Sequence, residues 1–138
     1  MTAVVLCALI ASTYTIHSER VCVDAVQAAV DVGADPYVAA ALVYAESRFA
    51  DDRVSSSGRV GPYQITVQYY CPDGVIDDCD LYHHGALALL RYLTDPEWTT
   101  LREQLCHYNS GSNRDCTTRS YAFADRIIAM IEELQDDN

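Results

Sequence analysis

The sequence predicts a mainly α-helical protein, a single domain over residues 1–138 with six to seven helices. Three observations predict it. The chain has 138 residues, which is the size of one domain with one hydrophobic core. Half of the residues are hydrophobic, which excludes a disordered chain. Apolar residues recur at helical spacing through most of the chain, without an internal repeat or a linker.

The first third of the chain predicts three helices in succession. Residues 3–17 are apolar on most faces and predict a buried helix. Residues 20–32 carry an apolar stripe at helical spacing that stops at a glycine. An Asp-Pro pair at 35–36 provides an N-cap and a first helical residue, and the helix that it opens is expected to continue to about Phe49.

The rest of the chain predicts a loop region and three further helices. Residues 50–62 are expected to be loop. Residues 63–70 alternate and are rich in β-branched and aromatic side chains, which fits a short strand or an irregular helix. A small β element is therefore expected near the glycines of this loop. Residues 71–80 predict a turn-rich, acidic loop. Helical periodicity then resumes in three segments, which are residues 82–94, 97–108 and 118–135.

The charge of the chain excludes one class of partner and disfavours another. The net charge is −11, from 20 acidic and 9 basic residues, and every basic residue is Arg. Such a chain will not bind nucleic acid through a phosphate footprint, and it is a poor ligand for anionic lipid. The apolar run at residues 4–11 is too short to span a membrane, so no transmembrane segment is expected. No basic residue precedes this run, which favours a buried helix over a signal segment.

The six cysteines indicate three disulfides and an oxidising compartment. Two pairs would each close a short loop in a polar stretch, and the remaining pair would link the first two helices. The expected pairs are Cys71–Cys79, Cys106–Cys116 and Cys7–Cys22. One alternative is six reduced, buried cysteines in a cytosolic protein. Another is a zinc site, although its spacing fits no standard zinc module, at Cys71, Cys79, His83 and His84. We expect neither a metal nor a cofactor.

Glu46 is the residue that most strongly indicates a function. It ends an otherwise apolar helical run, and a polar loop with two glycines follows it. Apolar neighbours and the negative end of a helix both disfavour the charged carboxylate and should raise its pKa. A carboxylic acid that stays protonated near neutral pH is what general acid catalysis requires. The alternative, for this residue alone, is a surface glutamate on an amphipathic helix.

Two more polar segments lie beside helix ends, at residues 61–64 and 108–111. The amides of Gln64 and Asn109 match the hydroxyl and N-acetyl groups of sugars. Tyrosine offers a flat apolar face with a polar tip, and the chain has ten Tyr against two Phe and one Trp. These residue types indicate a carbohydrate ligand.

Four motifs, in this order, resemble those of the soluble lytic transglycosylases. This family belongs to the lysozyme-like superfamily and is related to the goose-type lysozymes. The resemblance covers roughly residues 20–130. The motifs are Glu46-Ser47-x-Phe49, Ser57-x-x-x-Gly61-x-x-Gln64, Tyr108-Asn109-x-Gly111 and a late Tyr121.

The resemblance implies a lysozyme-like fold and cleavage of the β-1,4 bond between N-acetylmuramic acid and N-acetylglucosamine in peptidoglycan. It assigns Glu46 as general acid and then as base, which takes the proton from the sugar's own 6-hydroxyl and leaves a 1,6-anhydro product. Most glycosidases use two carboxylates, whereas only one acid here has an apolar helical setting. Asp51 and Asp52 keep a hydrolytic alternative open, because either one, facing Glu46, would position water as in a goose-type lysozyme. A catalytically silent glycan-binding or structural module is the other alternative.

The resemblance also implies roles for the remaining residues. Gln64 is expected near an N-acetyl group, Tyr108 near Glu46, and Asn109 as a brace for its loop. Tyr121 is expected either to line the cleft or to belong to the core.

Three loop residues complete the expected site. Tyr63 departs from the apolar residue usual in the family and would add a stacking surface for a sugar. Ser57 is expected to bond the backbone, and Gly61 to let the backbone approach the sugar. The implied partner is the peptidoglycan glycan strand. The implied location is periplasmic, extracellular or phage-associated, with a larger secretion or phage assembly as a further option.

Overall fold

The computed structural model describes residues 1–136 and confirms a mainly α-helical protein. Seven α-helices and one short 3₁₀ helix occupy this range, and almost no strand is present in it. The elements are α1 (Ala3–Thr13), α2 (Glu19–Val32), α3 (Pro36–Ser47), α4 (Val67–Tyr70), η1 (Pro72–Gly74), α5 (Leu81–Thr94), α6 (Leu101–Ser110) and α7 (Thr118–Asp136).

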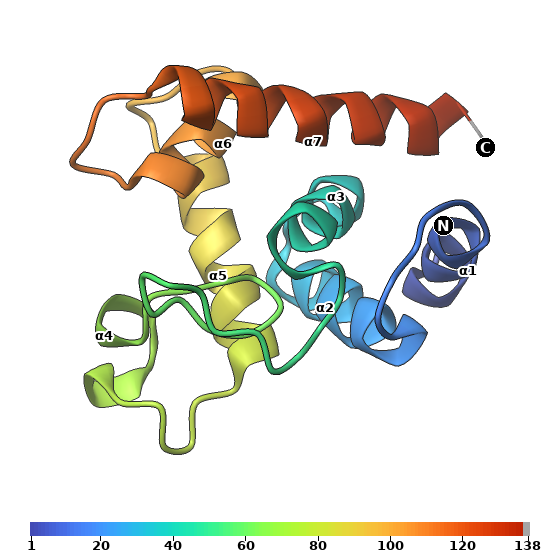
Figure 1. The fold of residues 1–138 in the computed structure, drawn as a ribbon, viewed down its shortest axis with the longest axis horizontal. Coiled ribbons are helices and arrows are strands. Elements are labelled where there is room, and N and C mark those ends of the chain that lie inside the picture. The colour runs from blue at the N-terminus through green and yellow to red at the C-terminus, as the bar shows by residue number, and fades with distance from the viewer. Residues whose placement is uncertain (137–138) are drawn as a thin grey trace.

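Helix α3 lies at the centre of the arrangement. It packs against α2 on one side and α7 on the other, while α1 covers the outer side of α2 (Figure 1). Helix α5 packs against both α2 and α6, and α6 packs on the first part of α7. The consecutive residues 38–43 of α3 are all buried. Three of them are alanines, whose small side chains let neighbouring helices approach from several directions.

Local sequence signals account for where most helices begin. A side-chain oxygen placed just before the helix accepts a hydrogen bond from a backbone N–H of the first turn and so satisfies a donor that the helix itself leaves unpaired. Helix α7 begins with a reciprocal pair, in which Ser120 N donates to Thr117 Oγ1 and Thr117 N donates to Ser120 Oγ. The other capping residues are Thr2, Ser18, Asp35, Asp80 and Thr100.

Two expected helices differ from the structure at their ends. The first helix ends at Thr13 rather than at residue 17, because the chain must turn before Ser18 caps the next helix. The helix expected over 97–108 begins only at Leu101. The Asp95 carboxylate accepts from Glu97 N at 2.9 Å, which makes a turn after the helix α5 instead of the start of a new one.

The small β element is present in minimal form. Val60 forms antiparallel bridges with Val54 and with Ile65, and no longer strand follows from them within residues 1–136. The segment 63–70 therefore combines a bridge residue at Ile65 with the single-turn helix α4.

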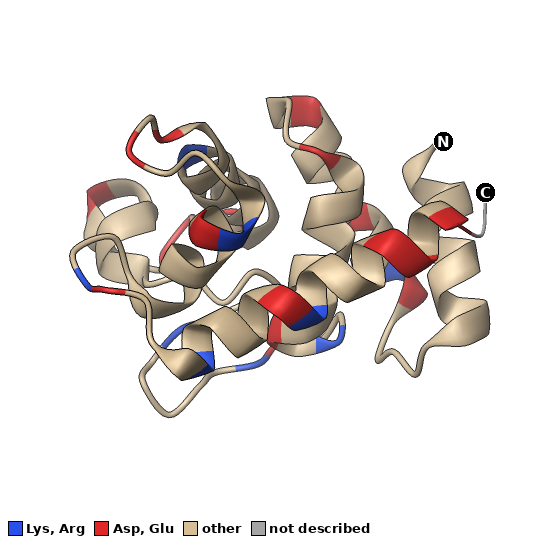
Figure 2. Ribbon diagram, turned by 90° about the horizontal axis from the view of Figure 1, so that it is seen from above, with Lys and Arg blue, Asp and Glu red and all other residues tan. Residues whose placement is uncertain are grey.

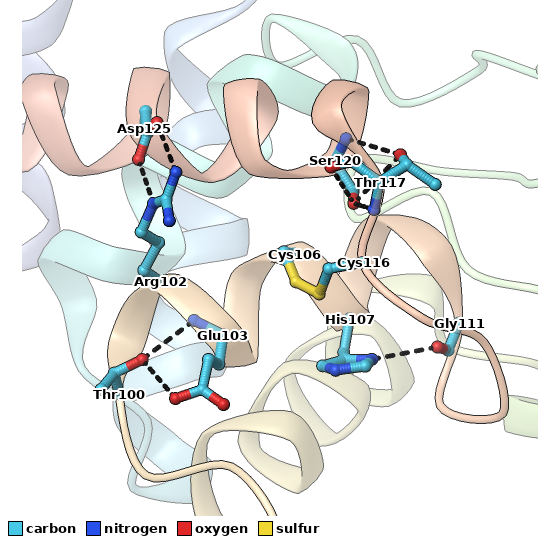
Figure 3. Close-up of a disulfide and its surroundings, with 10 residues drawn as sticks. All are labelled: Thr100, Arg102, Glu103, Cys106, His107, Gly111, Cys116, Thr117, Ser120 and Asp125. Atoms are coloured by element: carbon cyan, nitrogen blue, oxygen red, sulfur yellow. Dashed lines mark hydrogen bonds and ion pairs between the residues drawn. A yellow bond between two sulfur atoms is a disulfide. The ribbon is translucent and has the colours of Figure 1, made fainter.

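All three expected disulfides are confirmed. The Cα atoms are 5.9 Å apart in Cys7–Cys22, 5.5 Å in Cys71–Cys79 and 5.8 Å in Cys106–Cys116. The first ties α1 to α2, and the third ties α6 to the segment before α7 (Figure 3). Cys71 and Cys79 pair with each other, so their sulfurs are not available to the zinc site considered above. Three disulfides are typical of proteins that fold in an oxidising compartment.

Membrane insertion by a helix finds no support in residues 1–136. None of the helices there has both the length and the apolar character that a membrane span requires. Acidic positions are instead distributed over most helices and loops of the ribbon (Figure 2).

A close contact between Tyr63 and Gly85 joins the loop after α3 to the middle of α5. The Tyr63 ring is fully buried, and its hydroxyl donates to the backbone oxygen of Ala25 in α2 at 2.6 Å. A Cβ atom placed on Gly85 would lie 2.4 Å from Tyr63 Cδ2. Only glycine therefore admits the ring at this depth.

We expect Gly85→Ala to destabilise the protein by about 1–3 kcal/mol through overpacking, even though alanine is the better helix former. Urea unfolding of the variant measures this. In the Tyr63→Ala background the clash is gone, and there Gly85→Ala should be neutral or stabilising. An equal loss of stability in both backgrounds would contradict the contact.

Candidate active site

Glu46 occupies the last turn of the central helix, with a residue exposure of only 8%. The helix ends one residue later, and the next two residues, Arg48 and Phe49, both adopt left-handed backbone conformations. Such conformations are costly for residues other than glycine and concentrate at functional sites. The chain therefore turns sharply away from the helix immediately after the acid.

The Glu46 carboxyl group is buried but not engaged by the protein. Neither of its oxygens takes part in a hydrogen bond or an ion pair with residues 1–136, although every fully buried side-chain polar atom there has a partner. The carboxyl oxygens must therefore retain some accessible surface. The carboxyl group of Glu46 is thus mostly buried, has no hydrogen-bond partner in the described residues and keeps some surface open to solvent.

Burial raises the pKa of Glu46 from 4.5 to about 7. Loss of hydration is the largest cause, and the nearby positive charges of Arg59 and Arg53 oppose it without cancelling it. The protonated acid and the carboxylate therefore coexist near neutral pH, as the sequence led us to expect.

A network of backbone contacts holds the loop after α3 against Glu46. Arg53 Nη1 donates to the backbone oxygen of Glu46 at 2.5 Å. The Arg53 backbone oxygen in turn accepts from Gly61 N at 3.1 Å and from Gln64 Nε2 at 3.0 Å. Ser47 Oγ donates to the backbone oxygen of Pro62 at 2.9 Å. The loop is thus bonded to the end of the helix at two consecutive residues.

Gln64 lies in this network and is mostly buried, with an exposure of 4%. Its φ of 54° is left-handed, and its amide nitrogen donates to Gly61 O as well as to Arg53 O. Both amide hydrogens are therefore used within the loop, which leaves the amide oxygen as the group that can meet a ligand.

Helix α6 contributes Tyr108, whose hydroxyl donates to the backbone oxygen of Tyr63 at 2.7 Å. Burial, with a smaller contribution from the charge of Glu46, holds the pKa of Tyr108 well above 10. Tyr108 therefore remains a neutral donor. The hydroxyl fixes the backbone directly before Gln64, which places Tyr108 beside Glu46 as a brace.

The neighbouring Asn109 contacts the loop through its backbone. Its oxygen accepts from Arg59 Nη2 at 3.1 Å. Ser57 is exposed and bonds only Ser55 Oγ, whereas Ser55 also accepts from Arg59 N and so organises the turn. Of the residues expected at the site, the structure brings Glu46, Gln64, Tyr108, Asn109 and Gly61 together through these contacts.

Two expected ligand-contacting residues are placed elsewhere. Tyr63 has no exposed surface, so the stacking role expected for its ring is wrong, because the ring fills the space over Gly85. Tyr121 lies on α7 with the Arg102 guanidinium 4.2 Å above its ring, and none of its contacts reaches Glu46 or Gln64. Arg102 is held there by a bidentate pair with Asp125 (Figure 3).

Sequence reasoning missed the two arginines of the loop, Arg53 and Arg59. Each contacts the backbone of a residue at the site, and each acts on the pKa of Glu46. The available signal was weak but present, since all basic residues of this acidic chain are Arg and two of them fall in the loop after Glu46.

No carboxylate of residues 1–136 is among the groups that shift the pKa of Glu46. The charges that affect its pKa come only from arginines. Asp51, which was one candidate, acts instead on Tyr82 of α5, where it helps burial to raise the pKa of that phenol. Asp52 is exposed in the same loop.

Two cavities in the described residues are lined without Glu46. A cavity of about 300 Å³ lies between α2 and the start of α5, and its lining is acidic, with Asp24, Asp31 and Asp80 among its residues. A smaller one of about 20 Å³ is lined by Tyr70 and by Tyr92, whose ring contacts that of Tyr108. One group of ligand atoms within 4.8 Å of one another, formed by Cys106, His107 and Cys116, uses sulfurs that already form a disulfide.

Comparison of the chain with protein-family models, with curated proteins and with solved structures gave no match.

The raised pKa of Glu46 predicts a pH-dependent stability. The folded protein binds this proton more tightly than the unfolded chain does. The contribution of Glu46 to the free energy of unfolding is therefore greatest below pH 4.5 and falls as the pH rises to about 7. At 1.36 kcal/mol per pKa unit the loss is about 3 kcal/mol. Glu46→Gln should therefore gain stability over the native protein between pH 5 and pH 8, as followed by urea unfolding. The exposed Glu97→Gln should show no such gain, and an equal pH dependence of the two variants would contradict the burial effect.

Proposed function

We propose that the protein cleaves the β-1,4 bond between N-acetylmuramic acid and N-acetylglucosamine in peptidoglycan without consuming water, with Glu46 as acid and then as base. The observation that carries the proposal is the free, half-ionised carboxyl group of Glu46. It is desolvated enough to hold a proton near pH 7, and it has no partner in residues 1–136 that would occupy it. General acid catalysis requires a group in this state.

The proposed reaction uses this single group twice. Protonated Glu46 gives its proton to the glycosidic oxygen as the bond from that oxygen to C1 of the muramic sugar breaks. The resulting carboxylate then takes the proton of the sugar's 6-hydroxyl while O6 bonds to C1. The products are a 1,6-anhydro end and a free 4-hydroxyl, and Glu46 regains its starting form.

The lone acid favours this route over hydrolysis. An enzyme that hydrolyses with two carboxylates needs the second one within about 5–9.5 Å, depending on the stereochemical course. The groups that affect Glu46 are arginines, and Asp51 acts on a tyrosine of α5. We therefore favour the non-hydrolytic route and keep hydrolysis, as in a goose-type lysozyme, as the alternative.

The surrounding residues support a rigid reaction centre. Gln64 offers its amide oxygen, and Tyr108 fixes the backbone next to it. A catalytic group is effective when packing and hydrogen bonds hold the loop around it.

We place the protein outside the cytoplasm or on a phage particle, where it would meet peptidoglycan strands and where its disulfides would persist.

We expect Glu46→Gln to abolish the loss of turbidity of a purified peptidoglycan suspension, a decrease of at least about 100-fold, because the amide cannot donate the proton. Far-ultraviolet circular dichroism confirms that the variant is folded. Asp51→Asn and Asp52→Asn serve as matched controls on the same loop and should keep activity.

Mass spectrometry of the released fragments distinguishes the proposed reaction from hydrolysis. Anhydro ends support the proposal, whereas reducing ends would indicate hydrolysis. Binding of glycan without any turnover by the native protein would indicate a silent module, and full activity of Glu46→Gln would remove Glu46 from the mechanism.

The pKa of Glu46 also predicts the pH profile. Because the acid must be protonated at the start, kcat/KM should fall about tenfold per pH unit above about pH 7. The initial rate on soluble glycan fragments between pH 5 and pH 9 measures this. A profile that is flat across pH 7 would contradict the assignment of Glu46 as the acid.

A further inference from the structure

Two guanidinium groups beside Glu46 have no carboxylate partner. Arg53 donates to the backbone oxygen of Glu46, and Arg59 donates to the backbone oxygen of Asn109. Within residues 1–136 the ion pairs closer than 4.0 Å are Arg20–Asp24 and Arg102–Asp125, so neither loop arginine forms one.

Seven of the nine arginines form no ion pair within residues 1–136, and what sets Arg53 and Arg59 apart is that both act on the pKa of Glu46. The chain has 20 acidic residues against 9 arginines, and two aspartates directly precede Arg53. Figure 2 shows several basic positions gathered along the lower edge of the view, whereas acidic positions are distributed over the other sides. An arginine that pairs with backbone oxygen uses one of its five N–H donors and keeps its full charge.

The two charges also oppose the chemistry proposed for Glu46. A positive charge next to a carboxyl group favours the ionised form, and both arginines lower the pKa of the acid. Loop bracing alone does not need a cation, because a neutral amide side chain can donate to the same oxygens. The remaining N–H donors of the two guanidinium groups are therefore open to an anion from outside the protein.

We propose that Arg59, assisted by Arg53, binds a carboxylate of the substrate next to Glu46 and so restricts the enzyme to glycans that carry this group. The inference rests on the proposed function. Arg59 is the better placed of the two, because it is half-buried and its charge acts on Glu46, Tyr70 and Tyr108 together. A planar guanidinium with several free donors matches a carboxylate in a bidentate manner.

Binding of a carboxylate would also raise the pKa of Glu46. A bound anion neutralises the guanidinium charge, which removes the influence that lowers the pKa of Glu46 and leaves the effect of burial. A charged glycan thereby favours the protonated Glu46 that the first step needs. A neutral chitin-type glycan leaves the guanidinium charge in place and so does not favour the protonated form.

The carboxylate can come from two parts of the substrate. It is the lactyl carboxylate of muramic acid in strands that lack stem peptides, where this group is free. In strands that carry peptides it is a carboxylate of the peptide. Both have the same chemistry, so the experiment must include ligands of each kind.

The test measures binding by isothermal titration calorimetry with the Glu46→Gln protein, which cannot turn the ligand over. The ligands are a muramic acid tetrasaccharide with free lactyl carboxylates, the same compound with those groups as methylamides, chitotetraose, and a peptide-bearing tetrasaccharide. We expect the free acid to bind at least about tenfold more tightly than its methylamide and than chitotetraose, as for the loss of one charged pair.

The variant Arg59→Gln, in the same protein, should bind acid and methylamide alike, at the level of the methylamide. Glutamine keeps a neutral donor at this position, and circular dichroism checks that the variant is folded. Arg59→Lys should restore part of the discrimination, and the exposed Arg126→Gln of α7 is the matched control that should retain all of it. The peptide-bearing ligand is compared with the methylamide in the same way. If it binds more tightly, and if Arg59→Gln removes this gain, the site is assigned to the peptide carboxylate.

The outcomes separate the two proposals. Equal binding of acid, methylamide and peptide-bearing ligands with Arg59 present overturns the role of Arg59 and leaves the proposed function standing. No binding of any glycan overturns both. Discrimination that persists in Arg59→Gln also overturns the assignment, because another group would then hold the carboxylate.

Discussion

The candidate site depends on the way in which Tyr63 is anchored. Its ring lies against Gly85 of α5, its hydroxyl bonds the backbone of α2, and its backbone oxygen accepts from Tyr108 of α6. One residue thus joins three helices to the loop that passes Glu46. The next residue, Gln64, is held in a left-handed conformation by bonds to two other backbone oxygens of the loop. Without the anchor, a segment with only two isolated bridges would have little to fix it against the acid.

Burial and charge act on Glu46 in opposite directions, and burial prevails. Two arginines favour the carboxylate, yet the pKa still rises to about 7. The reason is geometric. The guanidinium of Arg53 bonds the backbone oxygen of Glu46, and that of Arg59 bonds Asn109, so neither forms a hydrogen-bonded pair with the carboxyl group. A charge that acts from a distance offsets only part of the lost hydration. The pKa of Glu46 is therefore set by burial and by the two guanidinium charges together.

The helices and the disulfides were predictable because their determinants are local. An Asp-Pro start, a serine cap and a glycine stop lie within a few residues of the helix that they bound, and the three cysteine pairs each close a short segment. The position of Tyr63 was not predictable, because it depends on Ala25 and Gly85, which are far away in the sequence. An aromatic residue in a glycine-rich loop has the same local pattern whether it faces a ligand or the core. The grouping of Glu46, Gln64 and Tyr108 was anticipated from motifs, whereas Arg59 required the fold.

If the protein binds peptidoglycan as proposed, the loop arginines meet an anionic polymer on an otherwise acidic protein. A net charge of −11 repels a polyanionic glycan, but salt screens that repulsion beyond about 8 Å at physiological ionic strength. At contact distance the local charge decides, and there the groups acting on Glu46 are positive. An acidic protein can thus bind the anionic polymer of the proposed function at one place. The absence of carboxylate partners for Arg53 and Arg59 within residues 1–136 keeps this local field intact. A neutral surface around the same acid would bind charged and uncharged glycans with little distinction.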